Sequence, residues 1–189
     1  KAVASSSASD ADYDKAINSG PVAADDVVAA STWAAAVKQA GKLVTGGTKT
    51  SEVFSWEDSK TKKISGFDAA IAQALARYII GGDDARSLLE VQQVTSDTRE
   101  TVLVNGTVKA VVATYTINPE RAKKIDFAGP YYASSQAILV KADNQDITGV
   151  DTLTGDVAVQ SSSSSAAALK KHAPKATAKP FDTQAKCVA

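Results

Sequence analysis

The stretch that decides the fold is residues 113–132, which read ATYTINPERAKKIDFAGPYY. Alternating apolar residues and threonines end a strand at Thr116, and a short helical turn that carries Arg121 follows. In open α/β sheets, ligands bind beyond the carboxyl ends of the strands. A guanidinium there offers a planar fork that pairs with a carboxylate through two hydrogen bonds. Arg121 is therefore a candidate for binding a small anion or an amino acid.

The neighbours of Arg121 leave two interpretations open. Thr114 and Thr116 lie on one face of the same strand and can add hydroxyl and backbone partners to a ligand site. The alternative is a surface arginine that pairs with Glu120 or Asp126. Spacing alone slightly favours this alternative.

Strands and helices alternate on the N-terminal side of this stretch. Residues 67–82, FDAAIAQALARYIIGG, predict a helix that ends at two glycines. Its apolar stripe is expected at Ala70, Ile71, Ala74, Leu75, Tyr78 and Ile79. The other predicted elements are a helix at 31–41, strands at 42–47, 87–94 and 108–116, a loop or small hairpin at 51–66, and a short helix at 98–106. This alternation is typical of an α/β lobe whose helices cover a largely parallel sheet.

The C-terminal side predicts a second unit of the same kind. Residues 117–144 open with the helical turn and lead into a long β-rich crossing segment. The elements expected next are a strand at 156–160, a run of serines at 161–165 and a helix at 166–172. Another helix begins within residues 181–189, so we expect a second lobe of which this chain holds only the first part.

Composition limits the classes of function. The chain has 189 residues with 21 basic and 21 acidic side chains, a balance that argues against nucleic-acid binding. Its basic stretch from Lys170 to Lys179 indicates a solvated helix face. No apolar run approaches the ~20 residues of a membrane span. One cysteine and one histidine cannot form a metal cluster or an internal disulfide, so we expect no metal and no cofactor. The sequence contains no nucleophile elbow, phosphate loop or HExxH motif.

Two loops are further candidates for ligand binding. Residues 160–165 lie between a strand and a helix, where free N–H groups and the helix dipole favour a carboxylate. A serine in this loop can instead be a simple N-cap, which spacing alone favours. The loop after residue 47 brings together Lys49, Ser51, Glu52 and Phe54. Phe54 and Trp56 are expected in the core unless this loop faces a cleft.

Residues 113–132 closely resemble the signature of the extracytoplasmic solute-binding proteins of polar amino-acid ABC importers, bacterial solute-binding protein family 3. In that family, a Thr-x-Thr-Pro-Glu-Arg type segment is followed by a segment with the pattern vdF…PYY. The resemblance spans residues 41–189 through GKLVTGG, ISGFDAAIAQALARYI, VTSDTRETVLVNGTV, QAILVKADN, ITGVDTLTGDVAVQ and AKCVA. In particular, the chain resembles the glutamate/glutamine-type binding lipoproteins of actinobacteria, including their Ser- and Ala-rich leader.

The resemblance implies an α/β bilobal clamshell, the type II periplasmic-binding-protein fold, in which two crossing strands join two lobes that close on one amino acid. We expect a tether or arm with a short helix at residues 1–40, lobe 1 at 41–138, and the crossing strand with the first part of lobe 2 at 139–189. The resemblance also implies an extracytoplasmic, lipid-anchored protein that delivers its ligand to permease subunits in the membrane. The alternative is a ligand sensor, a scaffold or an amino-acid dehydratase-type enzyme on the same fold.

The resemblance also implies which residues bind the ligand. Arg121 would hold the α-carboxylate, Thr116 would donate its hydroxyl and N–H, and Thr114 would offer its carbonyl to the α-amino group. The serine run would contribute donors from Ser163 and Ser164. The first loop would contribute Lys49, Ser51 and Phe54. The implied ligand is glutamate, aspartate or one of their amides, and the polar lining favours an acidic amino acid over an aliphatic one.

The sequence departs from the family pattern at two positions near these residues. Asn118 stands where a second threonine is usual, and its side chain can still bond the local backbone. Ser162 stands where a glycine is common, which raises the question of a positive φ at a non-glycine residue. The chain also stops before the family's later segment, which carries an aspartate for the α-amino group and the second crossing strand.

Overall fold

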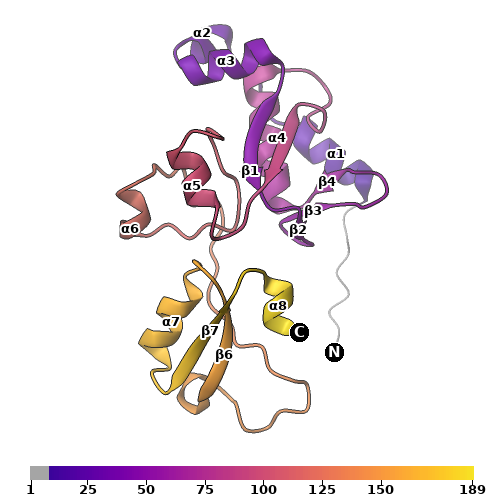
Figure 1. The fold of residues 1–189 in the computed structure, drawn as a ribbon. Coiled ribbons are helices and arrows are strands. Elements are labelled where there is room, and N and C mark those ends of the chain that lie inside the picture. Colours follow the sequence, from indigo (N-terminus) through magenta and orange to yellow (C-terminus); the bar gives the residue numbers. More distant parts are fainter. Residues whose placement is uncertain (1–8) are drawn as a thin grey trace. The chain divides into compact units, whose positions relative to one another are not determined.

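The structure, a computed structural model, describes residues 9–189. These residues form two compact units. Figure 1 shows their elements, coloured from the N-terminus to the C-terminus. Unit 1 consists of the chain up to Val94 together with Asn105–Thr114, and unit 2 consists of Thr95–Val104 together with Tyr115–Ala189. Residues 1–8, the first part of the expected tether, lie outside the described residues. The lobe boundaries expected from the sequence stay a prediction.

The sheet of unit 1 is built on two parallel strands, β1 (Leu43–Gly47) and β5 (Leu89–Gln93), in which Leu43 lies opposite Leu89. Gly46 joins a third segment to β1, since its N–H donates to the carbonyl of Ala110 at 2.9 Å. A parallel bridge between Gly46 and Val111 is the part of the predicted 108–116 strand that forms. The predicted parallel sheet is therefore present, with its third strand reduced to this bridge.

A small antiparallel sheet follows β1 and confirms the hairpin expected at 51–66. Its strands are β2 (Thr50–Ser51), β3 (Ser55–Glu57) and β4 (Ile64–Ser65). Ser51 lies opposite Ser55, and Trp56 lies opposite Ser65. Gly66 then leads into the long helix of the unit with φ 119, and a Cβ there would lie 2.5 Å from the backbone of Phe54. Only glycine allows this close approach of two backbones.

Helix α4 (Phe67–Ile80) packs beside β1 and β5 (Figure 1), and Gly81 ends it with φ 89. The helix was predicted, but its buried face was predicted wrongly. The structure buries Asp68, Ala69, Ala72, Gln73, Ala76 and Ile79, so that only Ile79 is shared with the predicted stripe. Apolar periodicity misses this face because two of its members are polar. Gln73 is tolerated there because its amide donates to the carbonyl of Ile64 at 3.1 Å and accepts from the hydroxyl of Tyr13 at 2.8 Å.

The apolar core of unit 1 lies where α4 meets two N-terminal helices, α2 (Asp25–Ala29) and α3 (Thr32–Ala40). Ser31 caps α3 by accepting from the N–H of Ala34, and Gly41 ends it with φ 64. Both features agree with the helix predicted at 31–41. The buried cluster consists of Ala23, Val28, Ala34, Val37, Leu43, Ala76 and Ile79.

An additional helix, α1 (Asp10–Asn18), forms where the sequence indicated a tether or a surface arm. Its aromatic residue Tyr13 bonds Gln73 on α4, and the guanidinium of Arg86 lies 4.4 Å from the Tyr13 ring centroid. Arg86 also forms an ion pair with Asp14. These polar contacts to distant residues, together with the buried Ile17, hold α1 on the unit. A reading of local hydrophobic pattern cannot detect such contacts.

Unit 2 contains the second strand–helix unit that the sequence predicted. Strand β6 (Gly155–Gln160), helix α7 (Ser165–His172) and strand β7 (Ala176–Phe181) follow one another, and β6 pairs with β7 in parallel. The shorter helices of the unit are α5 (Arg99–Val104), α6 (Pro119–Ala122), α8 (Gln184–Val188) and the 3₁₀ turn η1 (Val150–Thr152). Residues 123–149 form no helix or strand, so the expected crossing strand is absent. Residues 131–140 are exposed throughout, and no described strand pairs with them.

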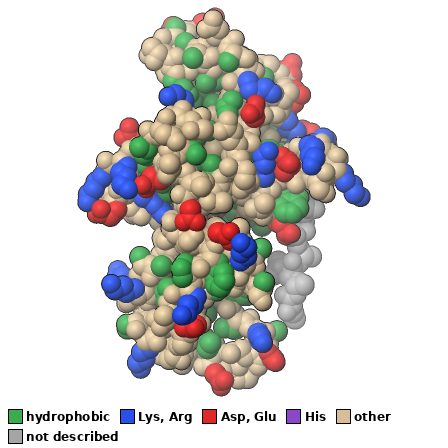
Figure 2. All heavy atoms as spheres, viewed as in Figure 1, with side chains coloured by type: hydrophobic (Ala, Val, Ile, Leu, Met, Phe, Trp, Pro, Cys, Tyr) green, Lys and Arg blue, Asp and Glu red, His purple; other side chains and the backbone are tan. Residues whose placement is uncertain are grey.

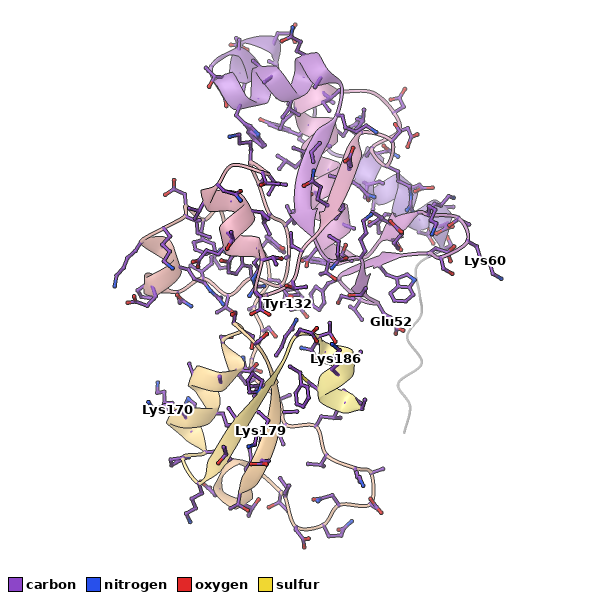
Figure 3. All side chains as sticks on the ribbon, in the orientation of Figure 1. Glu52, Lys60, Tyr132, Lys170, Lys179 and Lys186 are labelled. Carbon is purple, nitrogen blue, oxygen red and sulfur yellow. The ribbon has the colours of Figure 1, made fainter. Side chains whose placement is uncertain are left out.

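The described surface mixes both signs of charge. Basic and acidic side chains alternate over the visible face in Figure 2. Lys170 points away from α7 in Figure 3, and Lys179 forms an ion pair with Asp156 at 3.6 Å. The basic stretch is thus a solvated face, as the sequence indicated. Among residues 9–189, no helix is both long and apolar enough to cross a bilayer, and no cluster of His, Cys, Asp and Glu could hold a metal ion.

Candidate functional site

Arg121 lies in the short helix α6 of unit 2, and its backbone is fixed by the residue that departs from the family pattern. The side-chain oxygen of Asn118 accepts from the Arg121 N–H at 2.9 Å and so caps the helix. Pro119 at the first helical position favours the same turn. Asparagine is as good an N-cap as threonine, which explains why this departure is harmless.

The guanidinium of Arg121 is directed by two backbone carbonyls. Nη1 donates to the carbonyl of Thr116 at 2.7 Å, and Nη2 donates to the carbonyl of Ser162 at 3.0 Å. Within residues 9–189, Arg121 forms no ion pair, since Glu120 pairs instead with Lys123 at 2.7 Å. The structure therefore does not show the surface ion pair with Glu120 or Asp126 that the sequence left open. Two of the five N–H donors are used in these bonds, which leaves donors for a carboxylate.

Tyr115 lies under two cations. The guanidinium carbon of Arg121 is 4.6 Å from its ring centroid, and that of Arg99 is 3.9 Å away. Arg99 is 5% exposed. Burial, with the nearby Arg121 charge as a second cause, lowers the pKa of Arg99 to about 10. The site therefore gathers two positive charges around one aromatic ring, an arrangement that favours an anion nearby.

Sequence pattern does not single out Arg99. It lies in the stretch VTSDTRETVLVNG, which carries part of the family resemblance and predicts a short helix. An arginine at the start of a helix is electrostatically unfavourable, because the helix dipole is positive there. That conflict is the signal in the sequence that could have marked Arg99 as a functional candidate.

The serine run forms the loop between β6 and α7. Ser164 precedes the helix, and its hydroxyl lies 3.2 Å from that of Thr116. Ser163 donates to the carbonyl of Gln160 at 2.6 Å and accepts from the N–H of Ser165 at 3.2 Å. Ser163 therefore provides a local cap, whereas the Ser164 side chain makes no capping bond to α7. The cap interpretation thus holds for Ser163, and the binding roles of Ser163 and Ser164 stay predictions.

Ser162, which stands where the family commonly has a glycine, does have a positive φ. Its φ is 55, which is the left-handed conformation that a glycine adopts without strain. In this conformation, its carbonyl receives the Arg121 hydrogen bond. Ser162 thus adopts the backbone conformation that a glycine would adopt at this position.

A polar hollow of about 160 Å³ lies beside Arg121 in unit 2. It is lined by Ser96, Asp97, Glu100, Thr101, Tyr115, Arg121 and Ser162. Glu100 is neutralised by Lys124, whose Nζ lies 2.7 Å from its carboxylate. The hydroxyls of Ser161 and Ser162 hold the pKa of Asp97 below its ordinary value. The hollow is therefore hydrophilic and carries fixed charges of both signs.

The other predicted ligand residues belong to unit 1. Lys49 is half-buried and forms an ion pair with Glu57 at 2.9 Å, so its charge is already compensated. Ser51 is in β2, Phe54 is half-buried, and Thr114 is the last residue of the unit. Their place in a common site with Arg121 stays a prediction.

Comparison with known proteins identifies the family of the chain. Residues 43–184 match the bacterial extracellular solute-binding proteins, family 3, and the chain belongs to that family. It is 35% identical over 151 residues to a glutamine-binding protein of Geobacillus stearothermophilus, a match that covers 79% of this chain and 56% of that protein. It is 32% identical over 150 residues to a glutamate-binding protein of Corynebacterium efficiens, covering 77% and 50%. The chain thus spans about half the length of the curated relatives that it matches.

Solved structures of similar proteins show the same fold. An ancestral amino acid-binding protein, AncCDT-1, described as a precursor of cyclohexadienyl dehydratase, superposes with a TM-score of 0.73 at 32% identity. This match covers 84% of our chain and 69% of that one. An ancestral arginine-binding protein bound to arginine gives a TM-score of 0.68, also at 32% identity, over 78% and 64% of the chains. The expected family and the expected α/β periplasmic-binding-protein fold are thereby confirmed.

Proposed function

We propose that this chain is the substrate-binding component of an ABC importer and that it captures a polar amino acid. The observation that carries the proposal is Arg121, which lies at a polar hollow without an ion-pair partner in residues 9–189. Membership of family 3 and the names of the relatives, which are glutamine- and glutamate-binding proteins, support it. Arg121 would bind the α-carboxylate through its remaining donors.

We place the recognition of the ligand in the residues around Arg121. Thr116 and Ser164, whose hydroxyls lie 3.2 Å apart, would donate to the same carboxylate. Ser163 would add a backbone donor, and Thr114 would accept from the α-amino group. Lys49, Ser51 and Phe54 would complete the site from unit 1.

The charges favour glutamate, aspartate, glutamine or asparagine over an aliphatic ligand. Arg99 and Arg121 share the Tyr115 ring, and the hollow offers hydroxyl donors. A leucine side chain would leave these donors unpaired, at a cost of about 1–3 kcal/mol for each buried donor. Because Glu57 compensates Lys49 and Arg121 would hold the α-carboxylate that every amino acid carries, we assign the preference for an acidic side chain to Arg99.

An enzyme of the dehydratase type is the other candidate on this fold, and the structure gives it less support. Dehydration needs a general acid, which is a group that keeps its proton near neutral pH. Of the two carboxyls in the hollow, Asp97 has a lowered pKa and Glu100 pairs with Lys124. Neither is suited to act as that acid. The similar solved structure is itself described as an amino acid-binding protein.

The cellular setting is part of the same proposal. The family is extracellular by description, so we place this chain outside the cytoplasmic membrane with permease subunits as partners. A lipid anchor ahead of the Ser- and Ala-rich leader would keep it near the permease. Neither a cofactor nor a metal is needed for this role.

Calorimetric titration of the full-length protein, with both lobes complete, against each of the twenty amino acids tests the proposal. We expect saturable binding of glutamate, glutamine, aspartate or asparagine, with at least tenfold weaker binding of leucine and valine. Binding of leucine or valine as tight as that of glutamate would overturn the assignment of the polar site. Absence of binding for all twenty would overturn the function.

A further inference from the structure

The serine loop, Ser161–Ser165, is held by two side chains that are not among the proposed ligand contacts. The hydroxyl of Ser161 donates to the carboxylate of Asp97 at 2.5 Å. Gln136 donates to the hydroxyl of Ser164 at 3.3 Å and accepts from that of Ser165 at 3.0 Å. Asp97 therefore holds the start of the loop, and Gln136 holds its end.

The hydrogen bond between Ser161 and Asp97 lies next to the strained residue of the loop, Ser162. Ser162 has a φ of 55, a conformation that a non-glycine residue keeps only where its surroundings hold it. Asp97 accepts from the hydroxyl of the preceding residue, Ser161, while Arg121 donates to the Ser162 carbonyl. The strained residue is thus flanked by a bond to an anion on its N-terminal side and by a bond from a cation to its own carbonyl.

Asp97 has no other partner that would explain its position. It is exposed and forms no ion pair within residues 9–189, although Arg121 lines the same hollow. The second carboxylate of the hollow, Glu100, is paired with Lys124. The hydrogen bond from Ser161 is therefore the contact through which Asp97 acts on this site.

We propose that Asp97 is a positioning residue for ligand binding, which keeps the serine loop in its left-handed conformation beside Arg121. The inference rests on the proposed function of the Arg121 site. Without Asp97, Ser162 can relax to a negative φ, which turns its carbonyl and the following N–H groups away from their present directions. The ligand would then have to order the loop when it binds, and affinity falls when a site is not preorganised.

The first test replaces Asp97 in the full chain and measures the affinity for L-glutamate and L-glutamine by calorimetry. Asp97→Ala should raise the Kd about tenfold, since it removes a hydrogen bond to a charged group. Asp97→Asn should raise it less, because the amide oxygen still accepts from the Ser161 hydroxyl. The matched control is Asp156→Ala in β6, which removes an exposed carboxylate that pairs with Lys179 and should leave the Kd unchanged.

The second test separates positioning from a general loss of structure. Ser161→Ala should also weaken binding, but in the Asp97→Ala background it should add no further loss, because both changes break the same bond. The melting temperature of the ligand-free Asp97→Ala protein should match that of the Asp156→Ala control.

The outcomes distinguish this inference from the function on which it rests. If the wild-type chain binds glutamate or glutamine and Asp97→Ala binds it equally well, the inference about Asp97 is wrong and the proposed function stands. Additive losses from Asp97→Ala and Ser161→Ala would also overturn it. If the wild-type chain binds none of the twenty amino acids, both proposals fail.

Discussion

Tyr115 shows how single residues prepare the site for an anion. Its ring lies under both Arg99 and Arg121, at 3.9 and 4.6 Å from the ring centroid. The attraction of each cation to the ring offsets part of the repulsion between them. The remaining repulsion and the burial of Arg99 both lower the Arg99 pKa. A carboxylate that enters beside Arg121 would relieve this repulsion, so the residues favour binding of an anion before any ligand is present.

Ser162 provides a prediction at the same scale. Replacing it with glycine removes the strain at φ 55 but increases the freedom of the unfolded chain. Ser162→Gly should therefore leave the free energy of unfolding unchanged or raise it by up to about 1 kcal/mol. Its neighbour Ser163 has no positive φ, and its hydroxyl bonds the carbonyl of Gln160. Ser163→Gly should therefore lower the free energy by about 1 kcal/mol or more. Equal losses for the two variants in urea titrations would contradict this account of the loop.

At the scale of elements, α1 is held on α4 by a buried polar bond. Tyr13→Phe removes the hydroxyl that bonds Gln73, whose side chain is 1% exposed, and leaves the Gln73 oxygen without this donor. We expect the free energy of unfolding to fall by about 1–3 kcal/mol in urea titrations. Tyr78→Phe is the control, since Tyr78 is exposed and its hydroxyl makes no hydrogen bond to residues 9–189. If both variants lost the same stability, the bond to Gln73 would not be what holds α1.

The same contact predicts a dependence on alkaline pH. Burial raises the pKa of Tyr13 to about 12 from its ordinary value of 10.0. The folded state thus holds this proton more tightly than the unfolded state does. The stability that Tyr13 contributes is therefore complete below about pH 10 and is lost as the pH rises towards 12. The difference in unfolding free energy between wild type and Tyr13→Phe should shrink from about pH 9 to about pH 11.5, and a constant difference would contradict this.

Packing of β1 against the 108–112 segment depends on Gly46. A Cβ at this position would lie 2.8 Å from a methyl group of Val111 and 3.2 Å from one of Val94. Gly46→Ala should therefore lower the free energy of unfolding by about 1–3 kcal/mol. Gly20→Ala has open space around it and serves as the control. A Gly46→Ala protein as stable as this control would show that the contact is looser than described.

For the whole molecule, local patterns predicted most elements and few of the contacts between them. The helices at 67–80 and 165–172 and the strands β1, β5 and β6 were predicted because period and glycine placement are local signals. The buried face of α4 was predicted wrongly because the polar side chain of Gln73 is buried. Its hydrogen bonds go to Tyr13 and Ile64, which lie outside the helix. The crossing strand did not form, since a strand needs a partner and the described residues provide none.

For the site too, local motifs could be recognised in the sequence, whereas contacts between distant residues could not. Arg121 and Thr116 were found because a contiguous motif carries them, and they are in direct contact. Asp97, Arg99 and Gln136 were missed because only the folded chain brings them to the serine loop and to Tyr115. The ion pair between Lys49 and Glu57 also forms only in the folded chain. Because of it, we expect Arg99 and not Lys49 to select an acidic ligand.

The central claim is that Arg121 binds the carboxylate of an amino acid, and calorimetry on Arg121→Ala tests it most directly. Removing this guanidinium should weaken binding of the preferred amino acid about 30- to 5,000-fold, which corresponds to roughly 2–5 kcal/mol. Arg121→Lys should recover only part of the affinity, since an ammonium cannot reproduce the planar fork. The ligand-free stability should change by about 1 kcal/mol or less, because Arg121 is only half-buried and its contacts, two backbone carbonyls and the Tyr115 ring, include no ion pair within residues 9–189. Retained affinity together with a large loss of ligand-free stability would show that Arg121 is structural and would contradict the account.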